Sequence, residues 1–306
     1  MITITDEPLV TIGLPSYNRP EGLRRSLENA IRQTYQNLEI IIADNCSYDE
    51  MAINAVVEPI MKKDKRIKYF RHAKNEGALF NFKFLLQKAS GEYFMWIADD
   101  DERHETCVER SLEIIGKEGG AFGTYDVKNR YYNITHVHKV PTISNDMSLH
   151  KRLSKFIAVF PSVYIYGLYK TECLDFFLNE KEGYDFMDGY FAMYVLMNYG
   201  LNVRPTEYSI ITLGINEKNY VPKPFTTSAN KLLTYKPVIK KCYNLIWGSK
   251  QLNIFSKLFL LSFFLVHMAK QYVTYEHPYR FAAKVLNTTV RLPLRFIYRF
   301  IKNKSL

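Results

Sequence analysis

The feature that most constrains the fold is a series of four short apolar runs separated by helical patterns. The runs are four to six residues long and rich in β-branched and aromatic side chains, as is typical of strands buried on both faces. They are Leu9–Leu14, Glu39–Ala43, Ile67–Phe70 and Tyr93–Ala98, and the helices between them cover residues 20–31, 51–61 and 79–89. This alternation predicts an α/β, doubly wound, mostly parallel sheet.

Polar side chains follow three of these runs, where a sheet of this kind binds its ligands. Pro15, Ser16, Tyr17 and Asn18 follow the first run, Asp44 and Asn45 the second, and Asp99, Asp100 and Asp101 the fourth. Pro20 suits the first turn of the first helix, with Asn18 as its cap. The sequence therefore predicts a binding site at the carboxyl edge of the sheet.

Three consecutive aspartates repel one another, and a divalent cation removes that cost. Hard oxygen ligands select Mg²⁺ or Mn²⁺, which typically use one or two carboxylates together with substrate phosphates. We therefore expect Asp99, Asp100 and Asp101 to hold such an ion. The alternative is a solvated acidic loop in which Asp101 or Glu102 begins the next helix.

The chain lacks the glycine-rich loops that bind phosphates in other α/β folds. Residues 13–16 read Gly-Leu-Pro-Ser, so neither a GxGxxG fingerprint nor a P-loop follows the first strand. We expect the metal to hold the phosphates instead. Tyr17 offers an aromatic face for stacking on a base, and Asp44 offers an acceptor for a base or a ribose.

The pattern is looser after residue 110. We expect a helix over 105–117, a strand over 121–127, a loop or hairpin over 128–150, strands at 164–169 and 203–213, and a helix over 188–198. The aromatic segment 164–169 is either a core strand or an acceptor platform. The predicted domains are a catalytic domain over 1–215, with halves 1–110 and 111–215, a linker over 216–230 and a helical basic tail over 231–306.

The net charge of +10 is concentrated near the C-terminus. Residues 250–306 hold ten Lys and Arg and one acidic residue, Glu276, so this segment carries +9. Basic residues alternate with bulky apolar ones over 291–302, which favours a helix on an anionic bilayer over a nucleic-acid partner. The alternative is a helical hairpin packed on its own domain. The apolar run 258–269 has twelve residues, fewer than the roughly 18 needed to span a membrane.

The cysteines and the N-terminus indicate a cytoplasmic protein. Cys46, Cys107, Cys173 and Cys242 lie far apart and form no CxxC pair, so reduced thiols are expected. The first ten residues have neither the basic nor the apolar region of a signal peptide. With the basic tail, this predicts a peripheral protein on the cytoplasmic face of the membrane.

Three ordered motifs carry a resemblance to a known family. They are Pro15-Ser16-Tyr17-Asn18, Gln33-Thr34-Tyr35-Gln36-Asn37 and Asp44-Asn45-Cys46-Ser47, and Ala89-Ser90-Gly91-Glu92-Tyr93 leads to the aspartates. Residues 8–110 resemble the opening of the family-2 glycosyltransferases, which have the GT-A fold, and 160–215 resemble it more loosely. The resemblance implies an inverting, metal-dependent transfer of a sugar from a nucleotide-diphosphate sugar. The acceptor would be a saccharide or a lipid-linked saccharide, in cell-surface polysaccharide or glycolipid synthesis.

The resemblance also suggests roles for individual residues. The family's Asp-x-Asp-Asp ending places its first Asp on Ala98 and its metal ligand on Asp100, leaving Asp99 for ribose or phosphate, although a pairing of Asp99 with Asp101 also fits. The family's general base is the Asp of a Glu-Asp pair at the start of a helix. Asp188 matches that position, with Met187 in place of the Glu, and Asp185 is the second candidate. Asp188 equally suits a helix cap.

Two other kinds of protein compete with this interpretation. A nucleotidyltransferase also combines an α/β sheet with acidic metal ligands, but it needs a phosphate loop after the first strand, where the chain offers only Arg19. A non-enzymatic membrane or nucleic-acid binding protein would rely on the basic tail. Affinity for DNA that depends on salt and needs no nucleotide would favour that alternative.

Overall fold

The computed structural model describes residues 7–99, 101–123, 125–129, 134–138, 140–160, 162–184, 186–204, 210–213 and 231–276. The chain divides into two compact units, which we call the sheet unit (Met1–Met147 with Pro161–Val238) and the helical unit (Ser148–Phe160 with Ile239–Leu306). The linker expected at 216–230 lies outside the described residues, and the domain boundaries drawn from the sequence stay a prediction.

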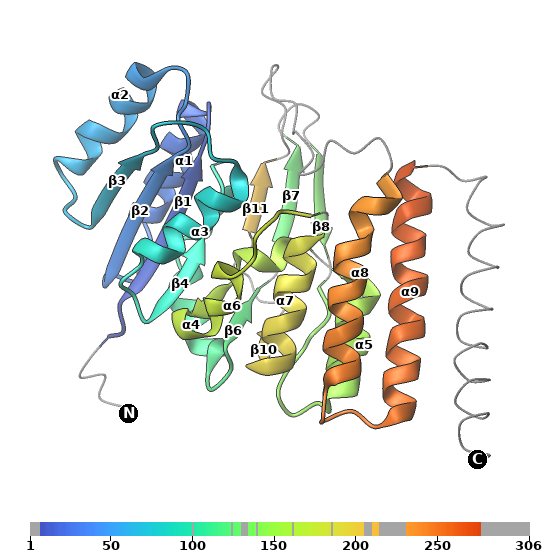
Figure 1. Cartoon of the computed structure of the whole chain (residues 1–306). Coiled ribbons are helices and arrows are strands. Elements are labelled where there is room, and N and C mark those ends of the chain that lie inside the picture. Colours follow the sequence, from blue (N-terminus) through green and yellow to red (C-terminus); the bar gives the residue numbers. More distant parts are fainter. Residues whose placement is uncertain are drawn as a thin grey trace, which may run out of the picture. The chain divides into compact units, whose positions relative to one another are not determined.

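A seven-stranded sheet forms the centre of the sheet unit (Figure 1). Every pairing in it is parallel except those of β9, which runs antiparallel to both of its neighbours. The order is β10 (Leu201–Val203), β6 (Gly120–Phe122), β9 (Leu168–Lys170), β4 (Tyr93–Trp96), β1 (Val10–Ser16), β2 (Leu38–Asp44) and β3 (Ile67–Arg71). The mostly parallel sheet expected from the sequence is confirmed.

A second sheet of four short strands has the order β5 (Asp101–Arg103), β11 (Ile210–Leu213), β7 (Tyr125–Asn129) and β8 (Ile134–His138). The helices of the sheet unit are α1 (Pro20–Ile31), α2 (Glu50–Met61), α3 (Ala78–Lys88), α4 (Cys107–Ile115), α6 (Asp175–Leu178) and α7 (Met187–Asn198). Two 3₁₀ helices, η1 (Ser162–Tyr166) and η2 (Thr171–Leu174), accompany them.

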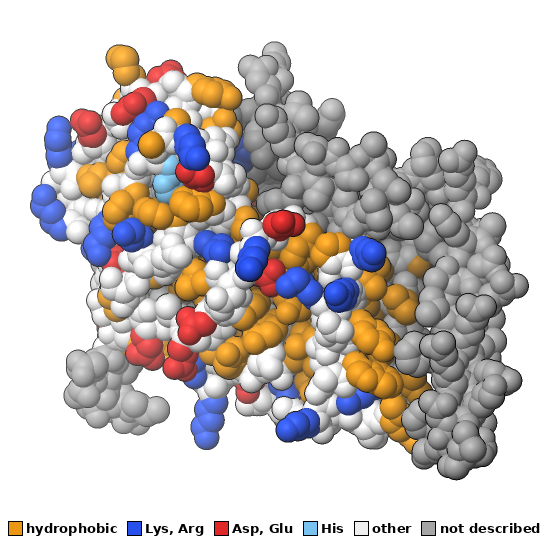
Figure 2. Space-filling view, in the orientation of Figure 1, with side chains coloured by type: hydrophobic (Ala, Val, Ile, Leu, Met, Phe, Trp, Pro, Cys, Tyr) orange, Lys and Arg blue, Asp and Glu red, His pale blue; other side chains and the backbone are white. Residues whose placement is uncertain are grey.

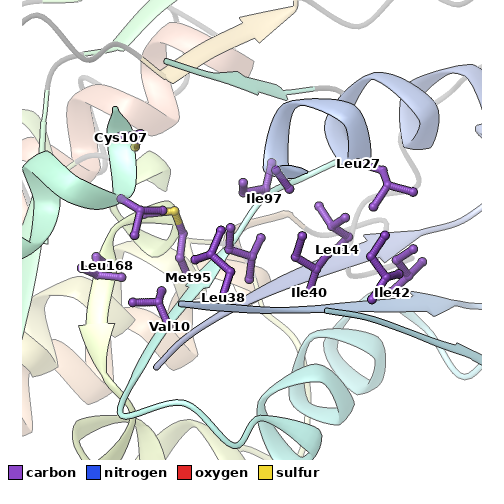
Figure 3. Close-up of a cluster of buried hydrophobic side chains, with 14 of the residues drawn as sticks. Val10, Leu14, Leu27, Leu38, Ile40, Ile42, Met95, Ile97, Cys107 and Leu168 are labelled. Carbon is purple, nitrogen blue, oxygen red and sulfur yellow. The ribbon is translucent and has the colours of Figure 1, made fainter. Parts of the chain in front are cut away.

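Alternate residues of β1 face opposite layers. Val10, Ile12 and Leu14 belong to the core under α1, α2 and α4, several of whose side chains are drawn in Figure 3. On the other face, a Cβ on Gly13 would lie 2.8 Å from Cζ of Phe94 and 3.2 Å from Cβ of Leu85. A side chain there would collide with the Phe94 ring of β4 and crowd Leu85 of α3, so glycine lets both side chains pack against β1.

The buried carboxylate of Glu39 links the amino-terminal ends of β1, β2 and β3. Glu39 accepts hydrogen bonds from Thr11 Oγ1 at 2.6 Å and from the Ser90 backbone N–H at 2.8 Å, and it forms an ion pair with Lys68. Burial alone would raise the pKa of Glu39, but the bonds from Lys68, Thr11 and Ser90 lower it below its ordinary value. The Gly91 amide donates to Thr11 Oγ1 at 2.9 Å, which extends the cluster to the start of β4.

The structure corrects three of the elements expected from the sequence. The segment 164–169 is a 3₁₀ helix followed by the three-residue strand β9, and the strand expected over 203–213 is two strands, β10 and β11. Asp101 and Glu102 lie in β5 and do not begin the next helix, which starts at Cys107. Tyr164 and Tyr169 are fully buried, so they belong to the core and form no acceptor platform.

The helical unit contains α5 (Leu149–Val159) and α9 (Ile254–Glu276), which pack against each other. It also holds the second half of α8 (Lys231–Gly248). The sequence did not predict α5, whose N-cap is Ser148, with its side chain accepting from the Lys151 amide. Among the residues that the structure describes, no helix combines the length and the hydropathy needed to cross a membrane.

Candidate functional site

Hydrogen bonds lock the loops after β1 and β2 together at the carboxyl edge of the sheet. The Asn45 amide donates to the Ser16 carbonyl at 2.9 Å, and the Asn18 amide donates to Ser47 Oγ at 2.8 Å. The Tyr48 amide in turn donates to Asn18 Oδ1 at 2.8 Å. Asn18 therefore bridges the two loops and does not cap α1, whose N-cap is Arg19.

Both loops pass through a left-handed backbone conformation outside glycine. Asn18 has a φ of +58° and Cys46 a φ of +63°. Such conformations cost about 1–3 kcal/mol each and tend to cluster at functional sites. Their presence on two adjacent loops marks this edge of the sheet as the candidate site.

Asp44 lies at the end of β2 with its carboxylate fully buried. Oδ1 accepts from the Ser47 amide at 3.0 Å and from Ser47 Oγ at 2.5 Å, while Oδ2 accepts from Tyr69 and Arg71. Burial and the Asp44 charge raise the pKa of Tyr69 to about 12, so its hydroxyl stays a donor. These partners surround the carboxylate, and among them the Arg71 side chain is 23% exposed.

The sequence interpretation missed Arg71, which ends β3. Its guanidinium binds Asp44, donates to the Ser47 carbonyl at 3.0 Å and lies 3.3 Å from Glu50. Burial opposes the charge, but the bonds to Asp44 keep the pKa of Arg71 above its ordinary value. A basic residue at the carboxyl end of a predicted strand was a signal that could have found it.

Asn45 and Pro15 hold the backbone at the carboxyl edge of the sheet. The Asn45 side-chain amide donates to Asn75 Oδ1 at 3.0 Å, and its oxygen accepts from the Glu76 backbone N–H at 2.9 Å. These bonds hold the loop between β3 and α3. Pro15 is buried in β1, in register with Ala43.

Asp99 is buried beside the loop after β1. Oδ1 pairs with Arg19 Nη1 at 2.8 Å, and Oδ2 accepts from Ser16 Oγ and the Tyr17 amide, each at 3.4 Å. A Cβ on Gly22 would collide with the carbonyl oxygen of Asp99, so the first turn of α1 lies directly against this residue. Asp99 thereby fixes the aspartate segment to the loop that carries Tyr17.

Three uncharged polar residues, two on α1 and one just after its end, hold the segment that follows the aspartates. Ser26 Oγ donates to the carbonyls of residues 98 and 101 at 2.9 and 3.0 Å. Asn29 exchanges two bonds with the backbone of Arg103, at 2.5 and 2.6 Å. Gln33 donates to the carbonyl of residue 104 at 3.0 Å and accepts from the amide of residue 108 at 3.1 Å. Gln33 begins the motif Gln33-Thr34-Tyr35-Gln36-Asn37, and the sequence interpretation gave Ser26 and Asn29 no role.

The aspartate segment suits a divalent cation in its chemistry. Asp99 and Asp101 follow β4, and carboxylate oxygens are the ligand type that Mg²⁺ and Mn²⁺ prefer. Asp100 lies outside the described residues. Within the part of the chain that the structure describes, no group of three or more His, Cys, Asp and Glu side chains forms a metal cluster by itself.

Two aromatic side chains lie at the rim of this edge. The rings of Tyr17 and Tyr48 are 5.9 Å apart in an edge-to-face arrangement. Tyr17 is half-buried, whereas Tyr48 is 86% exposed although its backbone is fixed by Asn18. The expected stacking residue is thus present, together with a second ring that the sequence interpretation did not consider.

Asp188 lies in the first turn of α7. The N-cap of α7 is Phe186, and the Asp188 carboxylate accepts from the Gly189 amide at 2.9 Å, so Asp188 is not the cap. α7 packs against η1, which contacts β4, the strand that leads to Asp99. Asp185 lies outside the described residues.

Comparison with solved structures defines the class of fold. The chain is similar to S. aureus TarS 1–349 in complex with UDP-GlcNAc, with a TM-score of 0.65 at 16% identity over 90% of this chain and 76% of that one. It is also similar to the mannosyltransferase PcManGT from Pyrobaculum calidifontis in complex with GDP-Man and Mn²⁺, with a TM-score of 0.51 at 17% identity over 98% and 84% of the two chains. The fold is therefore α/β and GT-A-like, as expected.

The family model of glycosyl transferase family 2 matches residues 11–176, and the chain belongs to that family. The putative colanic acid biosynthesis glycosyl transferase WcaA of Escherichia coli is 35% identical over 97 residues, which are 32% of this chain and 34% of that protein. Among such curated relatives, the aligned segment spans between 15 and 45% of the relative's length.

Proposed function

We propose that this protein is an inverting glycosyltransferase that moves a sugar from a nucleotide-diphosphate sugar to an acceptor hydroxyl. The observation that carries the proposal is the carboxyl edge of the sheet, where Asn18 and Asp99 join the loops after β1, β2 and β4 into one site. Membership of glycosyl transferase family 2 supports it, as do fold relatives solved with UDP-GlcNAc and with GDP-Man.

The nucleoside is assigned to the loops after β1 and β2. Tyr17 supplies a stacking surface, and Pro15, Asn18 and Asn45 hold the loops that shape it. Asp44 acts by holding the Arg71 guanidinium in place, because its own carboxylate is buried. This assignment refines the expectation that Asp44 contacts the base or ribose directly.

The diphosphate is assigned to the aspartate segment. Asp100 and Asp101 would hold Mg²⁺ or Mn²⁺, while Asp99 orients the segment through Arg19 and the Tyr17 amide. A divalent cation at this place supplies positive charge that stabilises a departing diphosphate. The complex of PcManGT with Mn²⁺ supports this choice of cofactor.

The chemical step needs a base for the acceptor. The acceptor oxygen forms a bond to the anomeric carbon while the bond from that carbon to the diphosphate breaks, and the hydroxyl proton passes to a carboxylate. We assign this role to Asp188, at the start of α7, and keep Asp185 as the second candidate. Since the displacement occurs once, the anomeric configuration inverts.

The acceptor is assigned to saccharides or lipid-linked saccharides, in the synthesis of a cell-surface polysaccharide. The similarity to WcaA, described as a putative colanic acid biosynthesis glycosyl transferase, supports this class. The basic helical unit supports a peripheral place on the cytoplasmic face of a membrane. Nucleic acid is not a proposed partner.

A panel of nucleotide-diphosphate sugars, each measured by thermal shift with and without Mn²⁺, tests the proposal. We expect one donor class to raise the melting temperature, and to raise it more with Mn²⁺. A protein that is stabilised by no nucleotide sugar, but turns over a nucleoside triphosphate and a sugar phosphate with release of pyrophosphate, would be a nucleotidyltransferase instead.

A further inference from the structure

The charge of the protein divides between its two units. The helical unit contains 15 Lys and Arg and one acidic residue, a net charge of +14, whereas the sheet unit contains 26 basic and 30 acidic residues, a net charge of −4. On the face drawn in Figure 2, Lys and Arg alternate with Asp and Glu over α2 and β3 of the sheet unit. The segment 148–160 adds three of the positive charges and no negative one, although it comes from the middle of the sequence.

The long helix α9 is apolar on two faces. Its inner face carries Leu260, Leu261, Phe264 and Met268, all buried, and α9 packs against α5. Its outer face carries Phe255, 80% exposed, Phe259, 55% exposed, and Val266, 50% exposed, and the Phe259 ring also lies 5.3 Å from the His150 ring of α5. These three positions follow one another at intervals of four and seven residues, so they form a single stripe along the helix.

The turn between α8 and α9 adds aromatic and basic groups. Lys257 Nζ donates to the Trp247 carbonyl at 2.7 Å and lies 5.9 Å from the centroid of the Trp247 ring. That ring stacks on Tyr243 with centroids 6.1 Å apart and remains 38% exposed. Amphipathic rings beside lysine stems are the side chains that settle at the headgroup level of a bilayer.

We propose that the outer face of α9 and the α8–α9 turn form the docking surface for an anionic lipid bilayer. We call this the α9 surface, defined by Trp247, Ile254, Phe255, Leu258, Phe259 and Val266. The occupant follows from charge complementarity, because the basic residues of the helical unit attract acidic headgroups while the exposed rings bury apolar area among the acyl chains. The inference adds a location to the proposed function, since a lipid-linked acceptor lies in the same bilayer.

Binding of the full-length protein to vesicles tests the surface. We expect flotation with vesicles of phosphatidylcholine and phosphatidylglycerol, and little with phosphatidylcholine alone. At about 1 M NaCl, where the Debye length falls to about 3 Å, binding should weaken strongly. No nucleotide sugar is present, so the result does not depend on glycosyl transfer.

Matched variants test whether vesicle binding depends on the α9 surface or on any exposed apolar residue. Phe255→Ser combined with Phe259→Ser should weaken vesicle binding by about tenfold or more, because two exposed rings are lost. Met51→Ser is the control, since Met51 lies in the sheet unit and is 83% exposed. Phe255→Ser alone, with unchanged circular dichroism, should still weaken binding severalfold.

A second pair tests the charge. Lys240→Gln combined with Lys250→Gln removes two exposed positive charges from the helical unit and should weaken binding about thirty-fold. Lys63→Gln combined with Lys65→Gln removes two exposed lysines from the sheet unit and should leave binding within about twofold of the parent.

Three results would overturn the proposal. They are equal binding to neutral and anionic vesicles, parental binding by the Phe255 and Phe259 double variant, and a parent dimer that this variant converts to a monomer. The last result would assign the α9 surface to a second copy of the chain. If vesicle binding behaves as expected while no nucleotide sugar binds, the docking surface stands and the proposed enzymatic function fails.

Discussion

Removing the buried carboxylate at the end of β2 should destabilise the sheet unit. Asp44→Ala leaves Arg71 without its buried partner, and of its partners among the described residues Arg71 keeps the exposed Glu50 and the Ser47 carbonyl. Breaking a buried ion pair from one side costs about 3–5 kcal/mol. The Arg71 side chain is 23% exposed, so water can partly solvate the orphaned charge, which places the expected loss at the lower end, about 3 kcal/mol.

Urea denaturation followed by tryptophan fluorescence measures this loss. The chain has two tryptophans, Trp96 in β4 and Trp247 in α8, so a Trp247→Phe background reports the unfolding of the sheet alone. With an m-value of about 3 kcal/mol/M, a loss of about 3 kcal/mol lowers the midpoint by about 1 M.

Glu50→Ala is the matched control, because it removes a 56% exposed carboxylate from the same arginine. An exposed pair contributes about 0–1 kcal/mol, so the midpoint should fall by less than about 0.3 M. Equal shifts for Asp44→Ala and Glu50→Ala would refute the reasoning from burial.

Three further changes test other parts of the structure. Asn29→Ala leaves two buried backbone groups of Arg103 without a partner and should cost about 2–4 kcal/mol, read as a lower melting temperature, whereas Asn198→Ala, which removes one exposed bond, should cost little. Because the pKa of Glu39 in the folded protein lies below its ordinary value of 4.5, the ionised carboxylate stabilises the fold above pH 4.5, and this stabilisation is lost as the pH falls further. Glu39→Gln should therefore reduce the fall of the urea midpoint at acidic pH. An unchanged fall would contradict the assignment. Asp188→Asn should keep donor affinity within a few-fold and lower transfer by about 10² or more, and near-normal turnover would move the base to Asp185.

Local patterns predicted the strands and helices of the first hundred residues well. The four apolar runs became β1, β2, β3 and β4: β1, β2 and β4 are buried along their whole length, whereas β3 lies at the edge of the sheet with only Ile67 buried. The carboxyl edge followed from this topology, and Ser16, Asn18, Asn45 and Asp99 do meet there.

Elements that depend on distant partners could not be predicted in the same way. β9 has three residues, and its strand character comes from antiparallel pairing with β4 and β6. Just before it, Tyr164 adopts a 3₁₀ conformation in which its carbonyl accepts from the Tyr169 hydroxyl. Nothing in the local alternation of residues 164–169 distinguishes this arrangement from one longer strand.

In the site too, the sequence identified individual residues but not the distant residues that they contact. Asp44 and Asp99 were identified as polar residues following strands, but their ion pairs with Arg71 and Arg19 join residues 27 and 80 positions apart. Ser26 and Asn29 were readable, since uncharged polar residues three positions apart on one helix indicate a face that holds a neighbouring backbone, whereas Gln33 follows the end of that helix.

The most direct test of the proposed function is release of a nucleoside diphosphate from the donor that the thermal-shift panel selects. The full-length protein, a saccharide acceptor and the donor are incubated with Mn²⁺ or with EDTA, and parent and Asp100→Ala are compared. We expect acceptor-dependent release by the parent with Mn²⁺ alone, with inversion at the anomeric carbon, and loss of release in Asp100→Ala. Equal release by Asp100→Ala, or equal release by the parent in EDTA, would contradict the assignment of the aspartate segment to a metal-bound diphosphate.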